Sequence, residues 1–168
     1  PGSAFGTGSH PTTRLCLEAL EQAPPVDALV ADLGCGSGVL GLAALGLGAT
    51  AVVAADTDSL AVRATGDNRE LNGRSEDQLR VSLGSVDALQ ELLQGRLADL
   101  LLCNILAPVI EALAPGFDSL VAPEGRALLS GLLVDQAPRL EQVLGDLGWG
   151  VTARGSQGRW GLLEIRRR

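Results

Sequence analysis

The sequence predicts an α/β domain with a mostly parallel seven-stranded sheet, helices on both of its faces and an antiparallel hairpin at the C-terminal end. Short segments that are almost entirely apolar alternate with helical segments, a pattern typical of parallel strands buried on both faces. A glycine-rich turn, Gly34 to Gly38, follows the first apolar segment, where a parallel strand passes into its helix. The last two strand segments are separated by Gly155 to Gly158, which is too short for a parallel crossover and suits a hairpin.

The same alternation places the elements along the chain. The first helix is expected to begin at His10-Pro11, because proline is favoured at the first helical position, and to end at Pro24-Pro25. Residues 1–27 are therefore a lead-in loop and helix, and residues 1–168 form one domain. The strands are expected at Leu29–Leu33, Ala51–Ala55, Leu79–Leu83, Leu100–Cys103, Ala127–Ser130, Gly150–Ala153 and Trp160–Ile165. The remaining helices are expected at Val39–Leu47, Ser59–Leu71, Ala88–Leu93, Ile105–Leu113 and Asp135–Leu147.

Composition excludes several classes of protein. A hydrophobic fraction of 46% is too high for a disordered chain. The formal net charge of −7 disfavours broad electrostatic contact with nucleic acid, and two Phe and two Trp are too few for a base-stacking platform. We therefore expect no direct nucleic-acid partner. The oligomeric state does not follow from the sequence.

The cysteines and the longest uncharged run bear on compartment. Cys16, Cys35 and Cys103 are an odd number without metal-ligand spacing, so we expect reduced thiols, no metal and a cytoplasmic protein. Cys35 lies in the glycine turn, where a small filling residue is favoured over a nucleophile because the only histidine is His10. Leu33–Ala55 carries no charge, but its six glycines indicate a turn, a buried helix and a buried strand rather than a membrane span. No signal peptide is recognisable.

A binding motif spans the first two strands. Asp32 to Gly38 reads Asp-Leu-Gly-Cys-Gly-Ser-Gly, and Asp56 stands at the end of the second apolar run. The glycines let the backbone approach a ligand closely, and an acid about 20 residues after such a turn accepts hydrogen bonds from both hydroxyls of a ribose. Simple packing of a glycine-rich turn is the alternative, which Asp56 makes less favourable. The pattern predicts a ligand with an adenosine-like ribose.

The phasing of the glycines distinguishes between two such ligands. Gly36, Gly38 and Gly41 satisfy the dinucleotide pattern G-x-G-x-x-G, so an NAD-dependent dehydrogenase stays a distant alternative. Asp32, however, stands two residues before the first glycine of the turn, where a carboxylate would face the pyrophosphate of NAD unfavourably. It suits a ligand with a cationic amino-acid end, such as S-adenosyl-L-methionine.

Three motifs together resemble one family of enzymes. Ala4-Phe5-Gly6-Thr7-Gly8-Ser9-His10-Pro11-Thr12-Thr13 is highly specific, Asp32–Gly38 is shared by many methyltransferases, and Asn104-Ile105-Leu106-Ala107 is intermediate. The chain resembles the PrmA family over essentially its whole length. The resemblance implies a Rossmann-like class I methyltransferase fold, S-adenosyl-L-methionine as cofactor, and methylation of lysine ε-amines and an N-terminal α-amine of the eleventh protein of the large ribosomal subunit. The family also carries an N-terminal substrate-recognition domain that this chain does not contain.

The resemblance assigns residues of the site. Thr13 corresponds to a threonine that contacts the cofactor, Gly34 to the turn glycine beside its methionine part, Asp56 to the ribose acid and Asn104 to the asparagine at the reaction centre. Asp87 follows the third strand, where related folds touch adenine. Further cofactor-binding residues are expected at Asp32, Gly36 and Phe5, the last in a loop that could close over the cofactor. For His10, contact with the ligand and an N-cap or loop role stay equally open.

Two questions are left open by the sequence. Asn104 could orient the acceptor amine with its side-chain carbonyl, or it could cap a helix beginning at Ile105. The domain could also methylate lysines of another protein, or bind the cofactor without turnover because its recognition domain is absent.

Overall fold

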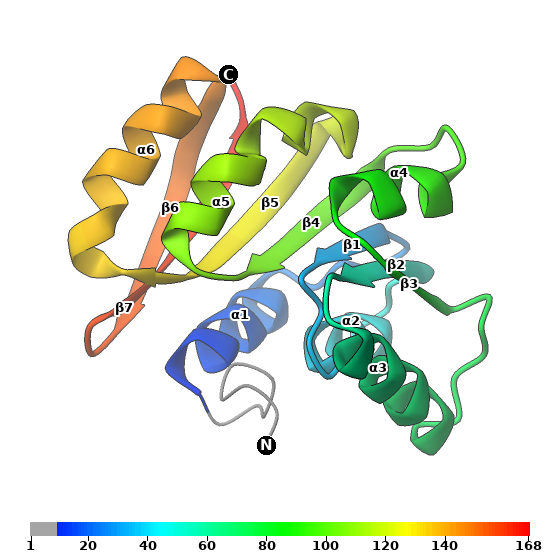
Figure 1. Cartoon of the computed structure of the whole chain (residues 1–168). Helices are drawn as coiled ribbons and strands as arrows, with labels where there is room; N and C mark the ends of the chain where they lie inside the picture. Colours follow the sequence, from blue (N-terminus) through cyan, green and yellow to red (C-terminus); the bar gives the residue numbers. More distant parts are fainter. Residues whose placement is uncertain (1–9) are drawn as a thin grey trace.

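The computed structural model describes residues 10–168 of the chain and shows a seven-stranded sheet in the order β3-β2-β1-β4-β5-β7-β6 (Figure 1). Strands β1 to β5 run parallel, and β7 pairs antiparallel with both β5 and β6. The strands are β1 Leu29–Leu33, β2 Ala51–Asp56, β3 Leu79–Leu83, β4 Ala98–Asn104, β5 Val121–Leu133, β6 Trp149–Gln157 and β7 Trp160–Arg167. The helices are α1 Pro11–Gln22, α2 Val39–Gly46, α3 Ser59–Leu71, α4 Val86–Leu93, α5 Ala107–Leu113 and α6 Ala137–Asp146, with short 3₁₀ helices at Ala114–Ser119 and Val134–Gln136. The predicted fold class is confirmed.

Several elements differ from their predicted limits. Strand β6 continues to Gln157, so the hairpin turn is Gly158-Arg159 rather than the four residues expected. Strand β5 has 13 residues, because its ends pair with Ala98 of β4 and with Trp160 of β7. Helix α5 begins at Ala107, not at Ile105, because Asn104 still belongs to β4.

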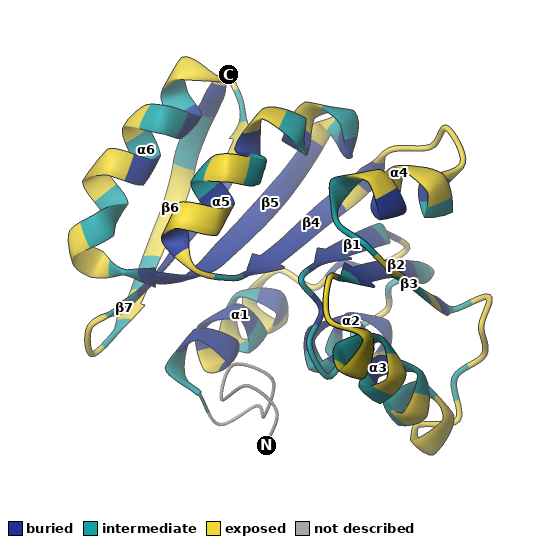
Figure 2. Ribbon diagram, viewed as in Figure 1, coloured by how far each residue is buried: buried dark blue, intermediate teal, exposed yellow. Residues whose placement is uncertain are grey.

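The core lies on both faces of the sheet. Successive side chains of a strand point to opposite faces, and both sets are buried here (Figure 2). Helices α4, α5 and α6 cover one face, where Phe117 and Leu89 are fully buried; α1, α2 and α3 lie on the other, where Leu20 and Leu100 are buried (Figure 1). No helix within residues 10–168 is long and apolar enough to cross a bilayer.

The register of the neighbouring strands β2, β1 and β4 aligns their carboxyl ends. Leu33 of β1 pairs with Ala55 of β2 and with Cys103 of β4. The next residue of each chain segment therefore lies at the same level, and these residues are Gly34, Asp56 and Asn104. Strand pairing alone therefore places side by side the three residues that the sequence predicts for a cofactor site.

A close backbone crossing holds the segment after β4 in place. The amide of Ile105 donates to the carbonyl of Ser130 at 3.1 Å, and Gly131 then passes directly beneath the backbone of Ile105 with φ +91°. A Cβ atom on Gly131 would overlap the carbonyl of Ile105. Glycine is required there both for its conformation and for its lack of a side chain.

We predict that Gly131→Ala is much more destabilising than Gly148→Ala. Both glycines have nearly the same φ, +91° and +93°, but a Cβ atom at Gly148 would meet nothing within 4 Å. Gly148→Ala should cost roughly 1–2 kcal/mol for its left-handed backbone. Gly131→Ala should cost about 1–3 kcal/mol more for overpacking. Urea unfolding of the two variants measures the difference, and equal costs would contradict the crossing.

Candidate functional site

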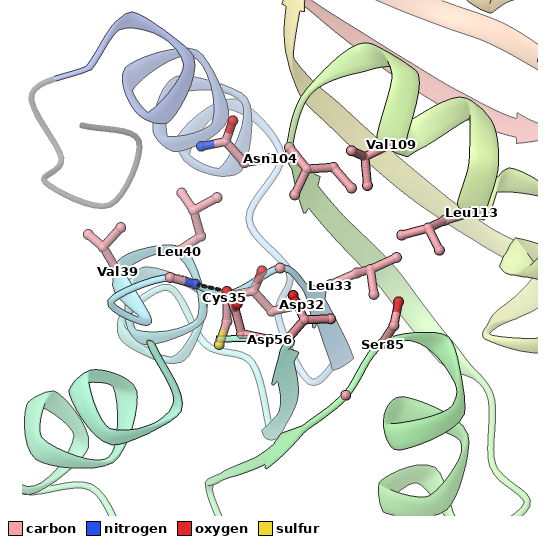
Figure 3. A pocket seen from close by; sticks show the side chains of 15 residues that line it. Asp32, Leu33, Cys35, Val39, Leu40, Asp56, Ser85, Asn104, Val109 and Leu113 are labelled. Carbon is pink, nitrogen blue, oxygen red and sulfur yellow. Dashed lines mark hydrogen bonds between the residues drawn. The ribbon is translucent and has the colours of Figure 1, made fainter. Parts of the chain in front are cut away.

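A cavity of about 510 Å³ opens at the carboxyl ends of β1, β2 and β4, between α2 and α5 (Figure 3). Its size is in the range of small-molecule sites. Polar groups from the three strands lie on one part of its wall, and aliphatic side chains of α2 and α5 form much of the rest. The lining residues are Asp32, Leu33, Gly34, Cys35, Gly36, Val39, Leu40, Asp56, Thr57, Gly84, Ser85, Asn104, Ile105, Val109 and Leu113.

The glycine turn forms the floor of this cavity. Gly34 has φ +77°, and a Cβ atom on it would lie 2.5 Å from Cγ2 of Ile105. The amides of Gly34 and Cys35 both donate to the carbonyl of Ala55, at 2.8 and 3.0 Å, which ties the turn to β2. Gly41 has a packing role instead, because a Cβ atom there would lie 3.0 Å from Cγ1 of Val52. The backbone of the turn can therefore approach a ligand as its sequence predicts.

Asp56 is held rigidly at the end of β2. Its Oδ2 accepts from the amide of Gly36 at 2.9 Å (Figure 3). Its Oδ1 accepts from the amide of Asp58, also at 2.9 Å. Each carboxylate oxygen can accept a second hydrogen bond. Asp58 in turn caps α3 by accepting from the amide of Leu60. Asp56 is thus a fixed carboxylate with acceptor capacity left for hydroxyl groups in the cavity.

Asp32 is a buried carboxyl in the same wall. It is 1% exposed, and its Oδ2 has no hydrogen-bond partner in the described part of the chain. Burial raises the pKa of Asp32 to about 7; the nearby Asp56 carboxylate adds to the rise, and a hydrogen bond with the backbone of Gly41 opposes it. A cation in the cavity would stabilise the ionised form of this group.

Asn104 presents an unpaired acceptor beside the cavity. Its Nδ2 donates to Oγ1 of Thr13 at 3.4 Å, while its Oδ1 is buried without a partner among residues 10–168. Asn104 is the last residue of β4, and the N-cap position of α5 is Leu106. The alternative that Asn104 caps the following helix is therefore wrong.

Two other residues assigned from the sequence, Thr13 and Asp87, lie outside the cavity lining. Thr13 is buried in α1 behind Asn104. Asp87 is exposed on the first turn of α4, where its carboxylate accepts from the amide of Ser85. This hydrogen bond lowers the pKa of Asp87. The neighbouring residues Gly84 and Ser85 line the cavity. Phe5 lies outside the described residues. These three assignments stay predictions.

His10 has a structural role in this arrangement. Its side chain accepts from the amide of Thr12 and so caps α1, and its ring meets that of Trp160 edge-on at 4.9 Å between centroids. His10 does not line the cavity.

Sequence reasoning missed the apolar wall. Val39 and Leu40 begin α2 directly after the glycine turn, while Ile105, Val109 and Leu113 follow β4 and lie along α5. The available signal was their position, since residues that follow two adjacent parallel strands face the same crevice. These side chains give the cavity an apolar wall.

The cysteines do not supply a nucleophile. Burial raises the pKa of Cys35, and its thiol shares a hydrogen bond with Oγ1 of Thr65 at 3.3 Å. Burial likewise raises the pKa of Cys16 to about 12. A raised pKa keeps these thiols protonated, and a protonated thiol is a poor nucleophile. Within the described residues, no group of His, Cys, Asp and Glu side chains has the arrangement of a metal site.

A parallel sheet in this strand order, with an antiparallel β7 and a cavity over the first glycine turn, is the fold of class I methyltransferases. The sequence model of the family "Ribosomal protein L11 methyltransferase (PrmA)" matches residues 1–168. The chain belongs to this family.

Individual relatives agree with this placement. A ribosomal protein L11 methyltransferase of Parasynechococcus marenigrum is 91% identical over the whole chain, which covers 58% of that protein. The crystal structure of a ribosomal protein L11 methylase from Lactobacillus delbrueckii subsp. bulgaricus is 34% identical and matches with a TM-score of 0.84 over 94% of this chain and 78% of that one. A putative RNA methyltransferase from Pyrococcus horikoshii shares the fold alone, with a TM-score of 0.75 at 19% identity over 93% and 82% of the two chains. The chain spans little more than half the length of the curated relatives that it matches.

The raised pKa of Asp32 predicts a specific pH dependence of stability. Between the ordinary value of 3.8 and about 7, the folded state binds more protons at this group than the unfolded state. The free energy of unfolding should therefore fall as pH rises through this window, by up to about 1.4 kcal/mol per pH unit, and level off above it. Asp32→Asn should remove this dependence. As pH rises from 4 to 7, the free energy of unfolding of the variant should therefore increase relative to that of the wild type.

Denaturant unfolding of both proteins across this pH range measures the effect. Asp67→Asn is the control, because it makes the same substitution at an exposed carboxylate on α3. If the curves of the wild type and Asp32→Asn run parallel across the window, Asp32 is ionised throughout.

Proposed function

We propose that this domain binds S-adenosyl-L-methionine and transfers its methyl group to amino nitrogens, namely lysine side chains and an N-terminal amine, of ribosomal protein L11. The observation that carries the proposal is the convergence of Asp32, Asp56 and Asn104 on one cavity, each with acceptor capacity left over.

The polar groups of the cavity suit the two ends of this cofactor. The fixed carboxylate of Asp56 can accept from both ribose hydroxyls, as the spacing after the glycine turn predicts. Asp32 offers a buried negative charge to the cationic sulfonium and α-amino end. Gly34 and Gly36 line the cavity without side chains, which lets the methionine part come close to the backbone of the turn. A dinucleotide, with its anionic pyrophosphate beside Asp32, would fit this charge pattern less well.

The chain's own residues then have to position an amine and exclude water. Bound S-adenosyl-L-methionine supplies a methyl group that its sulfonium has already activated for displacement. An amine that donates an N–H to Oδ1 of Asn104 keeps its lone pair free to face the methyl carbon. Asn104 cannot take the proton at neutral pH, so the proton of a lysine ammonium has to pass to water before transfer. Val39, Leu40 and Val109 provide the apolar surroundings that favour the neutral amine.

Ribosomal protein L11 as acceptor rests on the family to which the chain belongs. Such a partner would place the reaction in the cytoplasm. The remaining length of the relatives includes, by the resemblance noted above, a domain that recognises the substrate. A surface of about 800 Å² per partner is typical of specific protein complexes, and much of it would come from that domain. Methylation of another protein's lysines and cofactor binding without turnover are the alternatives, which mass spectrometry of L11 incubated with the full-length protein and the methyl donor distinguishes.

We predict that Asn104→Ala lowers turnover more than it lowers cofactor affinity. An interaction made with the acceptor in the transition state affects kcat and kcat/KM together, and a lost hydrogen bond of about 1 kcal/mol corresponds to roughly a fivefold change. Methyl transfer to L11 by the full-length protein gives the rates, and calorimetry with the cofactor gives the affinity. Full turnover in the variant would remove Asn104 from the reaction centre.

A further inference from the structure

The glycine turn after β1 needs contacts from other segments to fix its shape. Gly34, Gly36 and Gly38 have φ values of +77°, +55° and +85°. Glycine adopts such angles about as readily as negative ones, so these residues do not by themselves select one conformation. Ordering them only when a ligand binds would cost conformational entropy. Contacts that order the turn beforehand therefore raise its affinity for a ligand.

Helix α3 supplies two such contacts, to successive carbonyl groups of the turn. The hydroxyl of Thr65 donates to the carbonyl of Gly36 at 2.9 Å. Nδ2 of Asn68 donates to the carbonyl of Ser37 at 2.8 Å. A carbonyl oxygen only accepts, so the direction of both hydrogen bonds is certain. Thr65 and Asn68 are three residues apart and lie on the same face of the helix, which thus contacts the turn from 29 and 31 residues away in sequence.

Thr65 contacts the turn with both its hydroxyl and its methyl group. It is 0% exposed and is the only buried residue of α3, a helix whose residues are all described. Its one hydroxyl hydrogen goes to Gly36, so in the hydrogen bond of 3.3 Å with Cys35 the thiol is the donor. A Cβ atom on Gly38 would lie 2.9 Å from Cγ2 of Thr65. The one buried side chain of α3 is therefore used to place the turn.

Gly36 connects these contacts to the cavity. Its amide donates to Oδ2 of Asp56 and its carbonyl accepts from Thr65, both at 2.9 Å. The peptide groups on the two sides of its Cα atom are therefore both held. Gly36 and Asp56 line the cavity. Without the Thr65 hydroxyl, the peptide after Gly36 could rotate, and the amide that orients Asp56 would lose its fixed position.

We propose that Thr65 and Asn68 are positioning residues for cofactor binding, which hold the carbonyls of the glycine turn and so preform its binding surface. Neither residue lines the cavity. Both act through the turn rather than by touching the cofactor. The proposal rests on the proposed function for the identity of that cofactor, S-adenosyl-L-methionine. The order of the turn, however, can be measured without any ligand.

The test compares variants of α3 in the 168-residue chain. Thr65→Val removes the hydroxyl at nearly constant shape, and Thr65→Ser keeps the hydroxyl. Asn68→Ala removes the second donor at a half-buried position, so the test does not depend on one fully buried substitution. Asn72→Ala is the matched control, because Nδ2 of Asn72, at the C-cap of α3, donates to a carbonyl of the same helix at 2.7 Å.

Calorimetry with S-adenosyl-L-methionine measures the effect on the cofactor site. Thr65→Val and Asn68→Ala should each lower the affinity roughly threefold to tenfold, as expected for one lost hydrogen bond. Thr65→Ser and Asn72→Ala should stay within about twofold of the wild type. Unchanged affinity in both Thr65→Val and Asn68→Ala would overturn the proposal. An equal loss in Thr65→Ser and Thr65→Val would also overturn it, because the shape of the side chain rather than its hydroxyl would then matter.

Hydrogen exchange followed by NMR tests the positioning role independently of the ligand. In the ligand-free chain, the amide of Gly36 donates to Asp56 and should exchange faster in Thr65→Val than in the wild type or Asn72→Ala. An unchanged exchange rate in Thr65→Val would overturn the proposal. If the wild-type chain bound no cofactor, the proposed function would fail, while faster exchange of Gly36 in Thr65→Val would still support the role of α3 in ordering the turn.

Discussion

The structure depends above all on the parallel pairing of β1 with β2 on one side and with β4 on the other. This register sets Gly34, Asp56 and Asn104 at one level, so a ligand placed over the turn can reach all three strand ends. Because side chains alternate along a strand, a slip of one residue would turn Asp32 and Asn104 toward the opposite face. Two contacts fix the ends of β1 and β4. The amides of Gly34 and Cys35 donate to the carbonyl of Ala55 in β2, and Gly131 of β5 crosses the backbone of Ile105.

The site contains polar groups whose burial costs free energy in the absence of a ligand. Two carboxyls lie close enough for the charge of Asp56 to raise the pKa of Asp32, and Asp32 is fully enclosed. Oδ1 of Asn104 is buried without a partner among residues 10–168. Unsatisfied buried acceptors cost free energy, and they are tolerated where a ligand supplies the missing donors or charge. This is a physical reason to regard the cavity as a binding site, independent of any relative.

Much of the fold could be predicted from the sequence because its signals are local. Apolar runs, the glycine turn and Asp56 at a fixed spacing placed β1, α2 and β2 nearly to the residue. The length of β5 could not be predicted, since it depends on pairing with β7 and with Ala98 across the sheet. The burial of Thr13 behind Asn104 and the raised pKa of Asp32 likewise arise from packing between segments far apart in sequence. Asp87 was assigned by position alone, and its carboxylate is occupied at the start of α4, outside the cavity lining.

The central claim is that the carboxyl ends of β1, β2 and β4 form the S-adenosyl-L-methionine site. Calorimetric titration of the cofactor into the 168-residue chain and its Asp56→Asn variant tests it most directly. The amide oxygen can still accept from Gly36 in the turn, while the charge and the acceptor for the amide of Asp58 are lost. The account predicts one-to-one binding to the chain, weakened at least about tenfold in the variant through the loss of charged hydrogen bonds worth about 1.5–3 kcal/mol each. Equal affinities for the two proteins would contradict it.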